Sequence, residues 1–334
     1  MNKIAEKAKS ILIETPILPI LIIYFIIAFI LVPNFATTFN IRSLFLQVSD
    51  ILIVACGLTF VILNGGVDFS VTATLTVGSI MGAYVMALSP LASMPWVSIP
   101  VAIIFMLSIG LMIGLINGLA VSRLKMPSFI ATMATNLCFS GFAIWFTMQV
   151  AGRPSIHGLP RGFFVLGGSR NYFLIPIMIS IICCIFCHWL LTRTKFGREV
   201  YAIGVNSTSA EVSGVNVKKV TLYIMIISGL LAAVQGILLT ARNEAGIASL
   251  GDRMFLPIIA CVIVGGTSTA GGFGGIRNTV CGVLFVALIN NTMNLLQVEW
   301  NWLMSIQGLL ILMATLIGIG VKRSRRLNAL GGKL

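Results

Sequence analysis

Long apolar runs, each close to the length that crosses a bilayer, constrain this chain more than any other feature. Ten of them occur, at roughly 17–33, 44–63, 70–88, 97–121, 128–150, 172–191, 220–241, 255–266, 279–296 and 303–321. A helix needs about 20 apolar residues to cross a hydrocarbon core of about 30 Å. Barrel strands alternate in short segments and do not give continuous apolar runs. The sequence therefore predicts an all-α, polytopic helical membrane protein of about ten transmembrane helices, with residues 1–334 forming a single domain.

The charges set the expected orientation and exclude nucleic acid as a partner. Only 9% of residues are charged, against about 25% in soluble proteins. The net charge is +13, but the basic residues flank the apolar runs, as membrane topology requires. With the N-terminus inside, sixteen of the 22 lysines and arginines, including every lysine, fall on inner stretches. We therefore expect cytoplasmic N- and C-termini, a bacterial inner (cytoplasmic) membrane location, and a retained first span at 17–33.

No motif in the chain indicates an enzyme, a metal site or a bound cofactor. The run from Cys184 to His188 has the C-x-x-C-H spacing of haem attachment, but it lies within an apolar segment where thiols are not accessible. No P-loop sequence occurs, so this chain does not bind ATP in that way. With two histidines and no nucleophile–base pair, we expect no catalytic residues.

The longest polar segment, 192–219, is a candidate cytoplasmic docking loop. Thr208 and Glu211 have the S/T-x-x-E spacing of a capping box, and Gly214 is placed where a left-handed residue would end a short helix. This pattern predicts a short capped helix that docks a soluble partner, although a solvated linker with a turn is the alternative. The loop at about 151–171 is expected to be an irregular external cap.

Two glycine-rich stretches interrupt the apolar pattern, at 64–70 and 265–275. The apolar run before the second has only twelve residues, too few to cross the core unaided. Paired glycine-interrupted segments in transporters point to the substrate path. We therefore predict broken or re-entrant helices here; tight cytoplasmic hairpins are the alternative.

Polar side chains among the spans are candidates for the path. Asp50 and Asp68 are the most deeply set acids, and Asp68, inside a glycine break, is the better candidate, with backbone amides at the helix ends as its expected partners. Asn117 adds a neutral group, which suits an uncharged sugar, although asparagine also bridges membrane helices. Gly110, Gly114 and Gly118 predict close helix packing, either inside the bundle or at a dimer face.

Several stretches together resemble the permease subunits of bacterial ribose-type ABC sugar importers. They are GGVDFSV at 65–71, GLINGLAVSRLKMPSFIATMAT at 114–135, TKFGREVYAIGVNSTSAEVSGVNV at 194–217 and VIVGGTSTAGGFGG at 262–275. Thr72, Val205 and Asn278 stand where the family has glycine. The resemblance implies a transport subunit working by alternating access, with a second permease copy, cytoplasmic ATPase subunits that bind ATP-Mg, and a periplasmic sugar-binding protein as partners.

Residue roles follow from the glycine breaks and from this resemblance. The expected substrate pathway comprises Asn64, Gly65, Gly66, Asp68, Ser70, Asn117, Gly265, Gly266 and Thr267. The expected ATPase coupling segment comprises Arg198, Asn206, Ser207, Thr208, Ala210, Glu211, Val212, Ser213 and Gly214. A permease for nucleosides or branched-chain amino acids, and a stand-alone secondary transporter, remain alternatives. The scarcity of buried charge argues against the last, which needs its own ion relay.

Overall fold

The computed structural model describes residues 17–169 and 172–299, together with 302, 304–306, 308–309 and 312–313, and within them the chain is almost entirely helical. Within the described residues, seven helices are long and apolar enough to cross a membrane: α3 (Thr38–Leu63), α4 (Ser70–Ala87), α5 (Pro95–Ser122), α6 (Ser128–Ala151), α7 (Leu174–Arg193), α10 (Val217–Asn243) and α12 (Ile276–Leu295). Two apolar helices are shorter, α2 (Ile17–Leu31) and α11 (Phe255–Val264). The predicted span at 303–321 lies mostly outside the described residues.

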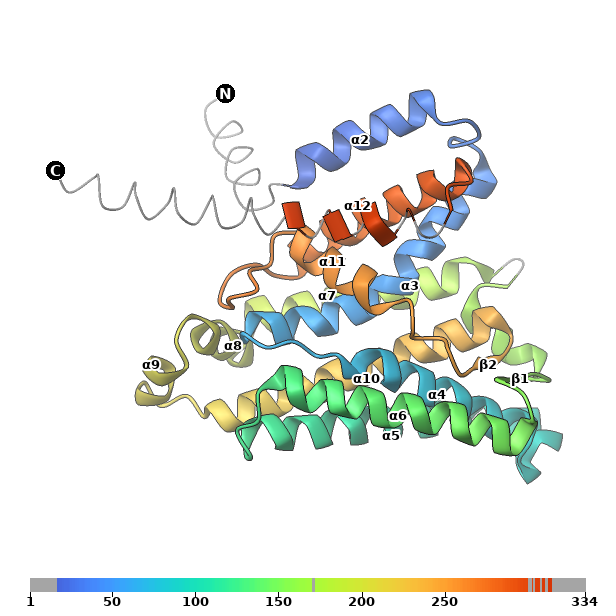
Figure 1. Ribbon diagram of the computed structural model, residues 1–334, viewed down its shortest axis with the longest axis horizontal. Helices are drawn as coiled ribbons and strands as arrows, with labels where there is room; N and C mark the ends of the chain where they lie inside the picture. The colour runs from blue at the N-terminus through green and yellow to red at the C-terminus, as the bar shows by residue number, and fades with distance from the viewer. Residues whose placement is uncertain are drawn as a thin grey trace.

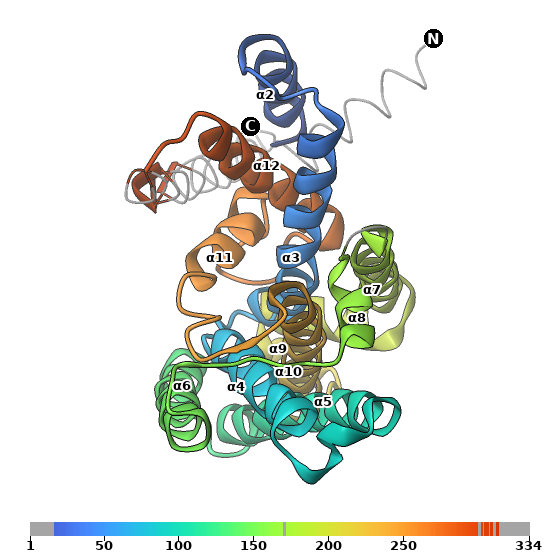
Figure 2. The same ribbon diagram turned by 90° about the vertical axis from the view of Figure 1, so that its right-hand side faces the viewer.

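Helix α3 runs through the middle of the molecule (Figures 1 and 2). Helices α4, α5, α6 and α10 lie on one side of it and α2, α11 and α12 on the other, as the end-on view shows. Its second half, residues 52–63, is buried throughout. We call the end of the bundle that carries α8 (Lys195–Val205) and α9 (Ser207–Val212) the inner end, and the opposite end the outer end.

Glycines let α5 and α10 pack with their backbones in contact. A β-carbon at Gly110 would lie 2.5 Å from the carbonyl oxygen of Gly229, and one at Gly114 would lie 2.7 Å from that of Met225. Such a carbon would overlap the neighbouring helix. The glycine repeat therefore serves packing inside the bundle, which was one of the two interpretations of the sequence.

Short elements cover the outer end. Strand β1 (Ser155–Ile156) pairs antiparallel with β2 (Gly246–Ile247). Two 3-10 helices, η1 (Pro90–Ser93) and η2 (Arg161–Gly167), complete this end. Phe163 is fully buried, and Gly167 lies directly against the backbone of Arg242. The expected irregular outer cap at about 151–171 is thus packed onto α10 in its described part.

Candidate functional site

The first glycine break, residues 64–69, joins α3 to α4, and side chains of α6 satisfy its backbone. The Val67 N–H donates to Ser128 Oγ (3.1 Å), and the Phe69 N–H donates to Thr132 Oγ1 (3.1 Å). Asn136 Nδ2 donates to the Phe69 carbonyl oxygen (2.8 Å). These three side chains are spaced four residues apart and so share one face of α6. Backbone without helical bonds is stable among spans only when other protein groups or water bind it.

The Asp68 carboxylate accepts three hydrogen bonds at this break. Its Oδ1 accepts hydrogen bonds from the Ser70 N–H (2.9 Å) and the Ser70 hydroxyl (2.6 Å), and its Oδ2 accepts one from the Ser228 hydroxyl (2.7 Å). The side chain is 2% exposed. The expectation that Asp68 holds a backbone amide at a helix end is confirmed for Ser70. In this conformation the carboxylate binds the start of α4 to α10.

The network continues through Asn117 on α5. Asn117 Nδ2 donates to Ser70 Oγ (2.8 Å), and its Oδ1 accepts from the Thr135 hydroxyl (2.7 Å). The structure therefore brings together three of the residues proposed from sequence: Asp68, Ser70 and Asn117. Their partners Ser228 and Thr135 were missed, because a serine or threonine in an apolar run carries no signal of what it faces.

The second glycine stretch, 265–275, lies against the inner end of α3 and against α8. The Gly272 N–H donates to the Leu63 carbonyl oxygen (2.9 Å). A β-carbon at Gly204 of α8 would lie 1.9 Å from the same oxygen, so only glycine fits there. A β-carbon at Gly271 would lie 3.1 Å from the Gly65 nitrogen. The two glycine breaks thus meet where α8 packs.

Gly265, Gly266 and Thr267 lie at the end of α11, at the start of this second stretch. Gly265 ends the helix, its carbonyl oxygen accepts from Asn278 Nδ2 (3.2 Å), and Gly266 has a φ of +103°. Thr267 is 3% exposed. No hydrogen bond among the described residues connects this group to the Asp68 network.

The polar loop forms two short helices, of which α9 is the expected docking helix. Asn206, and not Thr208, caps it: Asn206 Oδ1 accepts from the Ser209 N–H (2.9 Å), so the predicted capping box is wrong. Both residue types cap well, and the spacing to Glu211 favoured the wrong one.

The end of α9 agrees with the sequence. Gly214 has a φ of +86°, its N–H donates to the Glu211 carbonyl, and the Val215 N–H donates to the Ala210 carbonyl, which is a Schellman cap. Ala210 is buried, whereas Val212 is 86% exposed.

A basic cavity of about 600 Å³ lies beside α8. Its lining includes Arg193 from the end of α7, Tyr201 from α8, and Arg277 from the start of α12. The Tyr201 hydroxyl donates to the Gly274 carbonyl oxygen (2.8 Å) and so ties α8 to the second glycine stretch. Two arginines at this end agree with an inner, cytoplasmic position.

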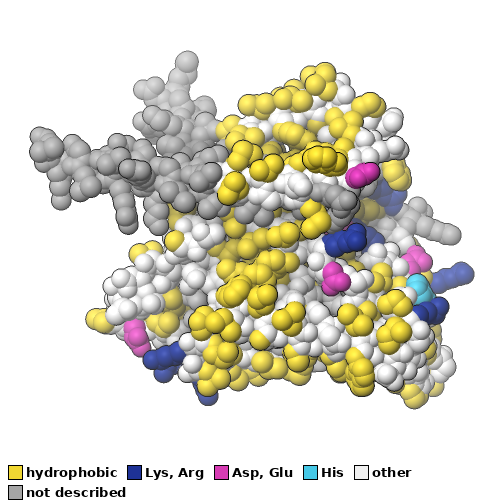
Figure 3. Space-filling view, viewed as in Figure 1, with side chains coloured by type: hydrophobic (Ala, Val, Ile, Leu, Met, Phe, Trp, Pro, Cys, Tyr) yellow, Lys and Arg dark blue, Asp and Glu magenta, His cyan; other side chains and the backbone are white. Residues whose placement is uncertain are grey.

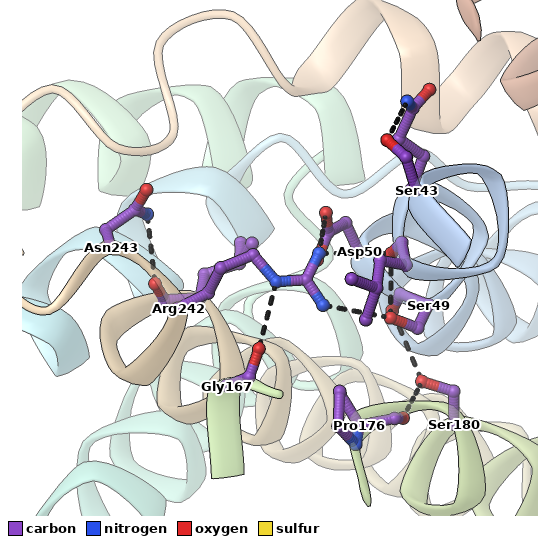
Figure 4. Close-up of polar contacts among 11 residues, drawn as sticks. Ser43, Ser49, Asp50, Gly167, Pro176, Ser180, Arg242 and Asn243 are labelled. Carbon is purple, nitrogen blue, oxygen red and sulfur yellow. Dashed lines mark hydrogen bonds and ion pairs between the residues drawn. The ribbon is translucent and has the colours of Figure 1, made fainter. Parts of the chain in front are cut away.

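At the outer end, Arg242 of α10 joins three elements (Figure 4). Its guanidinium forms an ion pair with Asp50 of α3 and donates to the carbonyl oxygens of Leu46 (3.2 Å) and Gly167 (3.2 Å). Asp50 was named as a deeply set acid from the sequence, but its partner, 192 residues away, was not predicted. The pair fastens the outer cap to α3 and α10.

Among the residues that the structure describes, no group of three or more histidine, cysteine, aspartate or glutamate side chains could hold a metal ion.

Seven described helices that are long and apolar enough to cross a membrane define this chain as a polytopic membrane protein. Residues 40–315 match the family described as the permease component of the branched-chain amino acid transport system, and the chain belongs to this family.

Curated relatives cover nearly the whole chain. The ribose import permease protein RbsC of Bacillus subtilis is 38% identical over 302 residues, covering 89% of this chain and 90% of the relative. The protein of the same name from Escherichia coli K12 is 32% identical over 314 residues, covering 92% and 94%. The L-arabinose transport system permease protein AraH of Escherichia coli K12 is 32% identical over 307 residues, covering 91% and 90%. No solved structure matches the chain significantly.

Proposed function

We propose that this chain is the membrane-spanning permease subunit of an ATP-driven, binding-protein-dependent importer that moves a monosaccharide by alternating access. The observation that carries the proposal is the similarity of nearly the whole chain to permeases named for ribose and L-arabinose. A relative named for xylose, from Haemophilus influenzae, is 32% identical over 343 residues. A ribose-like pentose or a related hexose is the proposed substrate.

The neutral side chains at the first break support a sugar over an amino acid. Ser70, Asn117, Thr135 and Asn136 carry amide and hydroxyl groups that bind one another and the backbone in this conformation; exchanged during alternating access, such groups suit the hydroxyls of an uncharged solute. The family description names branched-chain amino acids, so a permease for these, or for nucleosides, is the second candidate. The proposed pathway comprises Asn64, Gly65, Gly66, Asp68, Ser70, Asn117, Gly265, Gly266 and Thr267.

The working assembly is a homodimer of this chain in the bacterial inner membrane. Each copy has about ten spans, two of them broken by glycines, and cytoplasmic termini. ATPase subunits that bind ATP-Mg dock on the inner side, and a periplasmic sugar-binding protein delivers substrate from outside. The import permease names of the relatives support these partners.

We place the ATPase contact on α9 and its flanks, from Asn206 to Gly214, with Arg198 on α8. The exposed Val212 and the rigid cap at Gly214 support this placement. Detergent pull-down of the tagged chain, co-expressed with the ATPase and binding-protein genes beside it, tests the assembly. We expect two copies of this chain and two ATPase subunits per complex. A purified chain that never retains an ATPase subunit contradicts the proposal.

A further inference from the structure

The connection between β2 and α11 enters the interior of the bundle. A β-carbon at Gly246 would lie 2.5 Å from Cβ of Ala83, in the last turns of α4. A β-carbon at Gly251 would lie 2.4 Å from the carbonyl oxygen of Thr72, in the first turn of α4, and the Gly251 N–H donates to Thr76 Oγ1 (3.0 Å). Residues 246–251 therefore run along α4 from its outer end back to its beginning.

Contacts with α6 and α10 show how deep the start of α4 lies in the membrane. Asn136 Nδ2 donates to Thr72 Oγ1 (2.7 Å), and Asn136 stands fifteen residues before the outer end of α6. Asp68 binds Ser228, which also stands fifteen residues before the outer end of α10. At 1.5 Å per residue, both place this level about 22 Å inside the outer helix ends. Asn136 and Ser228 also stand eight and eleven residues after the inner ends of these helices, which is about 12–16 Å, so Gly251 lies in the central part of a core about 30 Å thick.

This depth explains why α11 is short. Its ten residues span about 15 Å, which covers only the inner half of the core. The outer half is crossed by the irregular connection along α4. The short apolar run predicts an incomplete span, but the segment that completes it was not predicted, because two glycines and several polar residues between apolar runs have the composition of an outer loop.

Two charged side chains follow Gly251 directly, and both are exposed. Asp252 and Arg253 precede α11 at the level just derived. Figure 3 shows charged side chains of both signs in the middle of this face, over the connection between β2 and α11. A charge facing lipid at this depth costs about 2.5–3.5 kcal/mol. The exposed Asp252 must therefore face water, a polar ligand or another polar protein group, and not lipid.

An aromatic surface adjoins the two charges. The ring of Phe255, the first residue of α11, stacks on that of Phe69 at the start of α4, with centroids 4.1 Å apart and an interplanar angle of 23°. Phe129 packs against Phe69 in a T-shaped arrangement, with ring centroids 5.3 Å apart. Ligand sites pair such apolar surfaces with a few charged or hydrogen-bonding groups. Sugars present both C–H faces and hydroxyls, and carboxylate and guanidinium groups bind hydroxyls strongly.

We propose that Asp252 and Arg253, together with the Phe69–Phe255 pair, form the contact site for a monosaccharide midway through the membrane. The inference rests on the proposed function and names the site of its substrate. The competing interpretation is structural: an acid two residues before the N-cap of α11 also stabilises the positive end of that helix.

Thiol labelling tests whether this surface meets water. Asp252→Cys is compared with Ile104→Cys, a residue of α5 that is 67% exposed on an apolar face. A membrane-impermeant methanethiosulfonate is applied to proteoliposomes of the full complex, and labelling of the wild-type chain, with its exposed Cys138, is subtracted as background. We expect position 252 to react at least about tenfold faster than position 104. Equal rates overturn the proposal.

Transport assays distinguish a substrate contact by Asp252 from stabilisation of the positive end of α11. The probes are D-ribose, D-xylose and L-arabinose, taken up with the binding protein and ATPase present. Asp252→Ala should lower the maximal rate about tenfold or more, the size of a lost hydrogen bond to a charged group, with KM unchanged because the binding protein captures the sugar. Glu244→Gln removes an exposed carboxylate from the outer end of the same connection and should stay within about twofold of wild type.

Asp252→Glu keeps a negative charge before α11 but displaces the carboxylate, and it should remain as slow as Asp252→Ala. Wild-type transport by either Asp252 variant overturns the proposal. If the wild-type complex moves none of the three sugars, the pentose assignment of the proposed function fails instead, and the labelling result still decides whether the surface meets water.

Discussion

Replacing Asp68 with alanine should remove the contact that holds the first break in place. The substitution leaves the Ser70 N–H, the Ser70 hydroxyl and the Ser228 hydroxyl without their acceptor, at a position that is 2% exposed. A buried donor without a partner costs about 1–3 kcal/mol, and hydroxyls can turn to other acceptors whereas the N–H cannot. We expect a loss of about 3 kcal/mol in the free energy of unfolding. Asp68→Asn keeps one oxygen for Ser70, and its amide can donate to Ser228, so it should lose about 1 kcal/mol.

Reversible unfolding of the purified chain in mixed detergent and SDS micelles measures these losses. A double-mutant cycle that combines Asp68→Ala with Ser228→Ala isolates the contact between Asp68 and α10, for which we expect a coupling energy of about 1 kcal/mol. Thr147→Val is a matched control, since that buried hydroxyl binds only a carbonyl of its own helix, and it should cost less than about 0.5 kcal/mol. The reasoning is refuted if Asp68→Ala is as stable as this control.

Three further substitutions test other contacts. Gly110→Val places a methyl group against the Gly229 carbonyl and should destabilise the chain by about 3 kcal/mol, seen as a lower yield of folded protein in detergent; normal yield and melting would contradict the α5–α10 packing. Glu211→Lys should uncouple uptake from ATP hydrolysis while the chain still inserts, and unchanged uptake would remove this side chain from the coupling contact. Arg242→Gln leaves the half-buried Asp50 carboxylate without its cation, so unfolding should become about 2 kcal/mol easier, whereas an unchanged melting temperature would make the outer ion pair dispensable.

Local features of this fold were predictable from sequence because their causes are local. Apolar length determines where a span exists, and the described apolar helices lie within the predicted runs or extend them by a few residues. Gly214 was identified because a left-handed residue after a short helix favours glycine, and the observed φ of +86° agrees. The capping box failed for a local reason as well, since Asn206 and Thr208 are both competent caps two residues apart.

The contacts that assemble the candidate site were beyond sequence reasoning because they join distant segments. Ser228 lies 160 residues from Asp68, and nothing in α10 shows which helix that hydroxyl faces. The inward course of residues 246–251 depends on close approach to α4 at two glycines, which composition alone does not distinguish from an outer turn. Ser128, Thr132 and Asn136 are spaced four residues apart in the sequence, but the spacing does not show that they bind the backbone of the first break, which the structure places against them.

The central claim is tested most directly by uptake into proteoliposomes that contain this chain with its neighbouring ATPase, supplied with ATP inside and the binding protein outside. D-ribose, D-xylose and L-arabinose are measured separately, together with ATP hydrolysis in the same vesicles. We predict that one of these sugars accumulates only with ATP and binding protein present, and that it stimulates hydrolysis. Movement of solute by the chain alone, without ATP, would contradict the assignment as an importer permease.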